Sequence, residues 1–138
     1  RKEMKIMKKI IAIILAIVTV MTLASCGKKA PDFNANTYED RMADTVMEID
    51  NMTYQYLGDN IIETEYKNGT YFIFLTVDGV NSSRLVMTSG LADSIGDLSR
   101  TIKRIFNVEC AITIMDDATH SKVLYGNLNG IDVTDYVN

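Results

Sequence analysis

The sequence is poor in the residues on which disulfide frameworks, metal sites and many active sites depend. Its 138 residues include two cysteines, one histidine, one proline and no tryptophan. Two cysteines allow at most one disulfide, and one histidine excludes sites built from several imidazoles. The sequence also has no glycine-rich phosphate loop and no Gly-x-Ser-x-Gly, Cys-x-x-Cys or His-Glu-x-x-His motif. We therefore expect no cofactor and no metal, and the sequence does not indicate a reaction.

Charge is absent from one long segment near the start. Residues 10–25, IIAIILAIVTVMTLAS, contain no charged side chain, and the basic stretch KIMKK precedes them. A basic start followed by an apolar run of this length is typical of a secretory signal peptide. A transmembrane helix is the competing interpretation, and it would need about 20 apolar residues. Since residue 1 is Arg, we expect the start of translation to lie upstream or at Met4.

The remainder of the chain is strongly acidic. Five of the 14 basic side chains but only one of the 18 acidic ones precede residue 26, so residues 26–138 carry a net charge of about −8. Such a protein is a poor candidate for binding nucleic acid, which needs clustered Lys and Arg. It would also be repelled by anionic lipid headgroups unless a covalent anchor held it at the membrane.

The end of the apolar run carries a recognisable motif. Leu23-Ala24-Ser25-Cys26 resembles the lipobox of bacterial lipoprotein precursors at all four positions. The resemblance implies that the Cys26 sulfur receives a diacylglyceryl group, that a peptidase cuts between Ser25 and Cys26, and that the new amino terminus can be acylated, as with palmitate. Two or more acyl chains hold a protein firmly at a bilayer, at about 0.8 kcal/mol per buried CH₂. A chance cysteine behind an ordinary signal peptide or anchor helix is the alternative.

The chain divides accordingly into three parts. Residues 1–25 are the expected signal peptide, and residues 26–36, with the only proline, form a flexible tether of a couple of nanometres. Residues 37–138 form one small domain. If Cys26 is lipidated, Cys110 is the remaining thiol. It lies in phase with Ile112 and Ile114, so we expect it to be buried and inert.

Two segments have the periodicity of helices. In residues 38–57, apolar side chains recur at helical spacing behind a potential N-cap at Thr37, and Gly58 follows as a C-terminal glycine. The second helix carries Leu91, Ile95, Leu98, Ile102 and Ile105, and Met87 and Phe106 fit the same stripe. Residues 84–88 fit either a strand or a helix. We interpret the basic cluster Arg100, Lys103 and Arg104 as a solvated face that complements the helix dipole.

A β-hairpin is predicted around Asn68-Gly69, which lies between two alternating segments. A two-residue turn would pair Tyr66 with Tyr71, Thr64 with Ile73 and Ile62 with Leu75 on a core face that also includes Val77. The opposite face would pair Glu65 with Phe72 and Glu63 with Phe74. We favour a covering element, such as the first helix, over this face. The alternative is an exposed aromatic and acidic strip, Glu63, Glu65, Phe72 and Phe74, that binds a partner or ligand.

The C-terminal part predicts two further strands around a polar turn at residues 116–121, and Asn129-Gly130 could lead into a short final strand. Asp116, Asp117 and His120 could be read as metal ligands, but aspartates in turns commonly hydrogen bond to the local backbone. The segment NLNGIDVTD has some resemblance to a calcium loop and fails the EF-hand spacing. We favour the structural interpretation of both segments.

These observations predict an α+β fold, a mainly antiparallel sheet of four or five strands packed with two helices, behind the signal segment. The leading functional hypothesis is a non-enzymatic binding or accessory lipoprotein, anchored to the membrane through Cys26 on the outside of the cytoplasm, with an envelope protein or wall component as partner. The alternatives are an envelope enzyme that acts on glycan through Glu63 and Glu65, and a solute-binding receptor, which the small size disfavours.

Overall fold

The computed structural model describes residues 2–27 and 38–137, and side chains within residues 5–19 and 42–136. The helices are α1 (Lys2–Gly27), α2 (Tyr38–Leu57), α3 (Ser83–Thr88), α4 (Leu91–Phe106) and α5 (Thr134–Val137), with a 3₁₀ turn, η1 (Gly58–Asn60). The strands are β1 (Ile61–Lys67), β2 (Thr70–Thr76), β3 (Glu109–Met115), β4 (Val123–Leu128) and β5 (Ile131–Asp132). The α+β class is as predicted.

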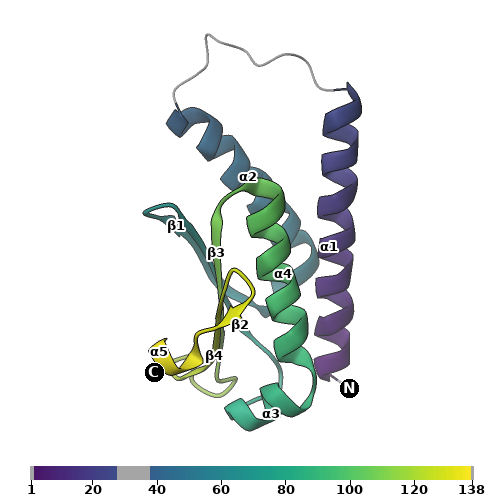
Figure 1. The fold of residues 1–138 in the computed structure, drawn as a ribbon. Helices are drawn as coiled ribbons and strands as arrows, with labels where there is room; N and C mark the ends of the chain where they lie inside the picture. Colours follow the sequence, from purple (N-terminus) through teal and green to yellow (C-terminus); the bar gives the residue numbers. More distant parts are fainter. Residues whose placement is uncertain (1, 28–37, 138) are drawn as a thin grey trace.

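The five strands form one mixed sheet in the order β1-β2-β3-β4-β5. Strand β1 pairs antiparallel with β2, β3 with β4, and β4 with β5, as expected for strands joined by short turns. The central pair, β2 and β3, is parallel. Parallel neighbours need a crossover connection, which α3 and α4 supply here. Helices α1, α2 and α4 stand on one face of the sheet, and within the described residues the opposite face carries no long helix (Figure 1).

The core lies between the sheet and this helical layer. The predicted helix over 38–57 is confirmed, with Ile49, Met52 and Leu57 buried, and α4 buries Leu91, Ile95, Leu98 and Ile102. The sheet contributes Tyr71, Ile73, Leu75, Cys110, Ile112 and Ile114 from β2 and β3. Cys110 is fully buried, in phase with the neighbouring isoleucines, as predicted.

The predicted hairpin is confirmed except at its open end. Asn68 and Gly69 form the turn with φ values of 53° and 83°, as a type I′ turn requires. Tyr66 pairs with Tyr71 and Thr64 with Ile73. The expected pairing of Ile62 with Leu75 is wrong, because the register shifts between Ile61 and Glu63 and Ile61 faces Leu75 instead. A bulge adds one residue to the strand and so moves Ile62 away from the predicted core position.

Residues 84–88, for which the sequence did not decide between strand and helix, lie in the short helix α3. Its first turn is capped by Ser82, whose Oγ accepts a hydrogen bond from the Leu85 backbone N–H at 3.4 Å. Met87 is 56% exposed, so its predicted place on the apolar stripe of α4 is wrong. Gly90, with a φ of 79°, separates α3 from α4, and α3 does not continue the face of α4.

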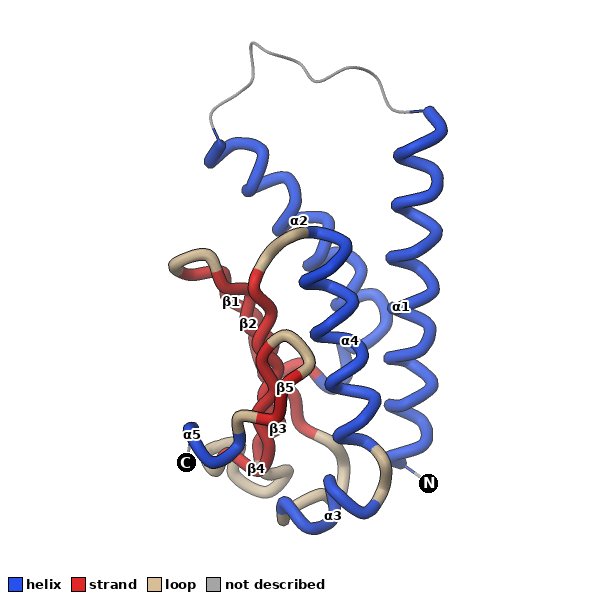
Figure 2. Tube along the Cα trace, in the orientation of Figure 1, coloured by secondary structure: helices blue, strands red, loops and turns tan. Residues whose placement is uncertain are grey.

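Helix α1 contains the predicted signal segment and lies beside α4 and α2 (Figure 2). Among the described residues, no helix combines the length and the apolar character needed to cross a bilayer. The side chain of Cys26, residues 28–36 of the predicted tether and the predicted cap Thr37 lie outside the described part of the chain.

Candidate functional site

The strongest candidate site is the face of the sheet that points away from α1, α2 and α4. We call it the open face. The register places Glu65 opposite Phe72 and Glu63 opposite Phe74, as predicted from the hairpin. These four side chains form the candidate binding strip, Glu63, Glu65, Phe72 and Phe74.

The expectation that the first helix of the domain covers these phenylalanines is wrong for the part of the chain that the structure describes. Helix α2 packs on the other face, over Tyr71 and its neighbours, which are completely buried. Phe72 and Phe74 are only half-buried. The physical reason is that Tyr71, Ile73 and Leu75 form the more apolar of the two faces of β2, and the helices cover that face.

The two phenylalanine rings stack along β2. Their centroids are 6.2 Å apart and their planes differ by 8°. The neighbouring positions on β3 hold short side chains, because Phe72 is in register with Ala111 and Phe74 with Thr113. On β4, Thr113 pairs with Gly126, which is buried, and Ala111 pairs with Leu128. The rings therefore have short side chains of β3 on one side and acidic side chains of β1 on the other.

The acidic side of the strip is exposed. Glu63 and Glu65 are both solvent-exposed, and no ion pair within the described residues involves either carboxylate. Lys67 follows them on the same face of β1 and is exposed too. The strip thus combines an aromatic surface with negative charge, an arrangement that suits a cationic side chain placed over or beside a ring.

A hollow of about 180 Å³ lies at one end of the strip. It is lined by Ile62, Glu63, Glu65, Phe74, Met115 and His120. Sequence reasoning missed Ile62, Met115 and His120 as members of this surface. The bulge moves Ile62, while Met115 ends β3 beside the turn that carries His120. The alternation of β3 gives Met115 the same face as Thr113, so Met115 was the one member that sequence could have found.

The segment after β3 that carries Asp116, Asp117 and His120 is a turn held by hydrogen bonds to Asp116. One oxygen of Asp116 accepts hydrogen bonds from the backbone N–H groups of Lys122 and Ser121 at 2.8 and 3.0 Å. The other accepts from the N–H and hydroxyl of Thr119 at 2.7 and 2.8 Å. These donors, the Lys122 N–H above all, hold the pKa of Asp116 well below its ordinary value. Among the described residues, no three His, Cys, Asp or Glu side chains are grouped as a metal site requires.

The segment resembling a calcium loop is likewise held by internal hydrogen bonds. Oδ1 of the buried Asn127 accepts from Ser99 Oγ at 2.5 Å and from the Gly130 N–H at 2.8 Å. Asn129 Oδ1 accepts from the Cys110 N–H at 2.8 Å. A hollow of about 470 Å³ lies nearby between α4 and the turn that joins β4 to β5. In its wall Arg100 pairs with Asp97 at 2.7 Å, so the basic cluster on α4 is partly neutralised.

The remaining thiol has the environment of a packing residue. Burial raises the pKa of the Cys110 thiol well above its ordinary value, which keeps it protonated and weakly nucleophilic.

Comparison of the chain with known protein families, with curated proteins and with solved structures gives no match.

Proposed function

We propose that this protein is a lipoprotein anchored through Cys26 on the outer side of the cytoplasmic membrane, and that the open face of its sheet binds a partner in the cell envelope. The observation that carries the binding proposal is the stacked pair Phe72 and Phe74, which is flanked by Glu63 and Glu65 and has no helix above it among the described residues.

The anchor is supported by the order of features along the sequence. A basic start, an uncharged run over residues 10–25, Leu23-Ala24-Ser25-Cys26 and a polar segment follow one another as a lipoprotein precursor would need. An acidic domain at a membrane surface also benefits from a covalent tie, because anionic headgroups repel it.

The chemistry of the strip favours a polypeptide partner with cationic and apolar side chains. Two half-buried rings offer apolar contact area, and the short side chains of Ala111 and Thr113 lie beside them on β3. Glu63 and Glu65 would meet lysine or arginine side chains of the partner, and a cation above an aromatic ring contributes about 0.5–2 kcal/mol. Aromatic anchors of this kind often dominate binding energy.

The anchor is tested by intact-mass measurement of the protein isolated from its native cells. We expect a chain that begins at Cys26 and carries the added mass of two or three acyl chains. A Cys26→Ala variant is the control and should retain residues 1–25 and gain no lipid. A native protein with an unmodified thiol and its leader attached would overturn the anchor.

The binding strip is tested by photo-crosslinking in cells. A photoreactive residue in place of Thr113, beside the rings, should give a discrete crosslinked product in the envelope. The product should be lost in a Phe72→Ala, Phe74→Ala double variant. The matched control is Leu85→Ala, Met87→Ala, which removes exposed apolar side chains from α3 instead.

The crosslink should survive the control substitutions. Equal loss in both double variants, with both proteins folded and anchored, would contradict the assignment of binding to the open face.

A glycan-directed enzyme is the second candidate, since Glu63, Glu65 and His120 line one hollow. Glu63→Gln, Glu65→Gln should abolish release of soluble fragments from wall material if this reaction occurs. The same variant should weaken but not abolish the crosslink if the carboxylates only attract a cationic partner.

A further inference from the structure

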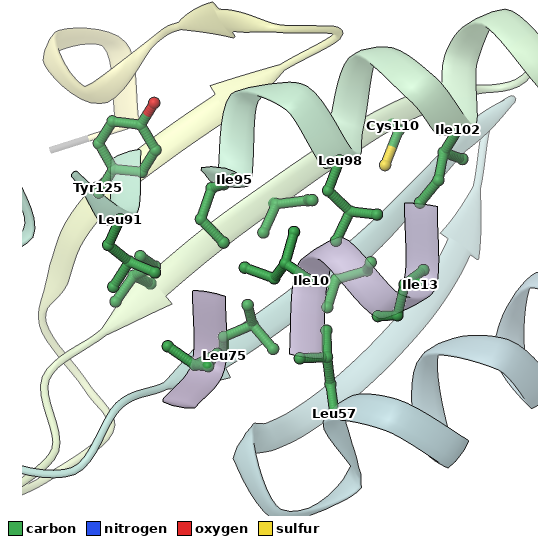
Figure 3. Close-up of a cluster of buried hydrophobic side chains, with 14 of the residues drawn as sticks. Ile10, Ile13, Leu57, Leu75, Leu91, Ile95, Leu98, Ile102, Cys110 and Tyr125 are labelled. Carbon is green, nitrogen blue, oxygen red and sulfur yellow. The ribbon is translucent and has the colours of Figure 1, made fainter. Parts of the chain in front are cut away.

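Helix α1 buries one complete face in the core. Its inward side chains are Ile6, Ile10, Ile13 and Ile17, each at most 1% exposed. Their spacing of four, three and four residues is that of one helical face. Figure 3 places Ile10 and Ile13 among Leu57 of α2, Leu75 of β2 and Leu98 of α4.

The outward face of the same helix is also apolar. Ile11, Leu15 and Val18 are 52%, 62% and 44% exposed. A helix with aliphatic side chains on all sides is suited to hydrocarbon or to a fully enclosed core, and half of this one meets water. The apolar outward face is what the signal segment of the proposed lipoprotein would need in a bilayer. The inward face packs against the core of the domain.

Lipoprotein processing would separate α1 from the rest of the domain. Cleavage between Ser25 and Cys26 would remove the helix that now covers the groove between α2 and α4. The groove walls, Leu57, Leu75 and Leu98, are completely buried beneath it. Without an occupant, this wall would be an apolar surface of the kind that marks an interaction site.

One end of the groove is polar and favours a cation. Lys9 Nζ donates a hydrogen bond to Asn60 Oδ1 at 2.9 Å. A hollow of about 180 Å³ at this end brings Lys5 and Lys9 together with Asp59 and Asp78. The groove therefore has a direction, with its acidic end against the basic amino-terminal end of the helix it holds.

We propose that this groove is a docking site for a helix of a second envelope protein, an aliphatic helix with lysines at its amino-terminal end, and that α1 occupies it until the leader is removed. The proposal rests on the proposed lipoprotein processing. The occupant is defined by the helix seated there: branched aliphatic side chains at steps of four, three and four, and an ammonium group that reaches Asn60 and Asp59.

The test uses the processed protein, isolated from native membranes in detergent, and a synthetic peptide of residues 2–19 as the probe. A photoreactive residue replaces Ile14. Two peptide variants are compared. The outward variant has Ile11→Gln, Leu15→Gln and Val18→Gln, and the inward variant has Ile10→Gln, Ile13→Gln and Ile17→Gln. The variants have the same charge and nearly the same hydropathy, so detergent affects them alike.

We expect the outward variant to crosslink to α2 and α4 with a yield at least roughly tenfold above that of the inward variant. Asp59→Lys in the protein should reduce crosslinking of the outward variant. If the processed protein is unfolded alone, recovery of a cooperative melt with only the outward peptide would equally support the proposal. Equal yields, crosslinks elsewhere, or a dimer that buries α2 and α4 and excludes both peptides would overturn it.

The experiments distinguish failure of the docking proposal from failure of the proposed lipid anchor. A protein found by mass to retain residues 1–25 removes the processing step and leaves α1 as a permanent core helix. A lipidated protein that ignores the outward peptide removes the docking site and leaves the anchor intact.

Discussion

The hydroxyl of Tyr71 donates a hydrogen bond of 2.5 Å to Oδ1 of Asp50, which joins the start of β2 to α2. Thr64 Oγ1 donates to the same oxygen at 3.0 Å, and Thr53 Oγ1 lies 3.2 Å from the Tyr71 hydroxyl. Burial, followed by the nearby Asp50 carboxylate, raises the pKa of Tyr71 well above its ordinary value. The phenol therefore remains a hydrogen-bond donor, and the network fixes α2 over one face of the hairpin.

Tyr71→Phe should lower the free energy of unfolding by about 1–3 kcal/mol, because Asp50 loses a buried donor while the ring remains. Urea denaturation measures the change. The matched control is Tyr66→Phe on the paired position of β1, where we expect a change within about 0.5 kcal/mol. Similar losses in the two variants would show that the phenol group of Tyr71 has no special role.

The hairpin illustrates how much of the fold follows from local sequence. Asn68-Gly69 determines the turn, and the alternation on both sides determines that Glu65 meets Phe72 and Glu63 meets Phe74. The two long helices follow equally from their apolar spacing. The bulge that moves Ile62 has no comparable signal, because no glycine marks it and the alternation continues through it.

Features that depend on contacts between distant segments of the chain could not be predicted from the sequence. Whether a helix covers Phe72 depends on which face of β2 is the more apolar when β3 lies beside it, and the parallel pairing of β2 with β3 depends on the path of α4. The same holds for α1. Its composition predicts a signal segment, but only the packing against α2 and α4 reveals that one face matches the core.

Asp116→Asn should lower stability at neutral pH and have a diminishing effect in acid. The folded pKa of Asp116 is depressed, so its contribution is present above the unfolded value of about 4 and is lost as pH falls towards the folded value. The difference between the thermal midpoints of wild type and variant should therefore be larger at pH 7 than at pH 3. Asp44→Asn, at an exposed position of α2, is the control and should show little difference at either pH. A difference for Asp116→Asn that does not change with pH would contradict the interpretation.

Gly130→Ala should destabilise the protein by about 1–3 kcal/mol. The φ of Gly130 is +91°, and a Cβ there would lie 2.7 Å from Arg100 Nε and 3.1 Å from Arg100 Cβ. Gly58→Ala is the matched control, since its Cβ would meet nothing within 4 Å, and it should be neutral or slightly stabilising. Chemical denaturation of both variants distinguishes strain at one turn from a general effect of losing glycine. A stable Gly130→Ala protein would mean that the turn after β4 can relax.

Ile13→Ala and Leu15→Ala together test whether α1 packs on the domain in the unprocessed chain. Ile13 is completely buried, so its truncation should cost about 2–5 kcal/mol, whereas Leu15 is 62% exposed and its truncation should change stability by less than about 0.5 kcal/mol. The chain is made by cell-free synthesis, which leaves the leader attached, and unfolding is followed by circular dichroism. If both truncations are neutral, α1 contributes nothing to the folded domain, and the groove between α2 and α4 stays open before cleavage as well as after it. If both are costly, the outward face of α1 is covered as well, and its exposed aliphatic side chains no longer indicate a segment made for hydrocarbon.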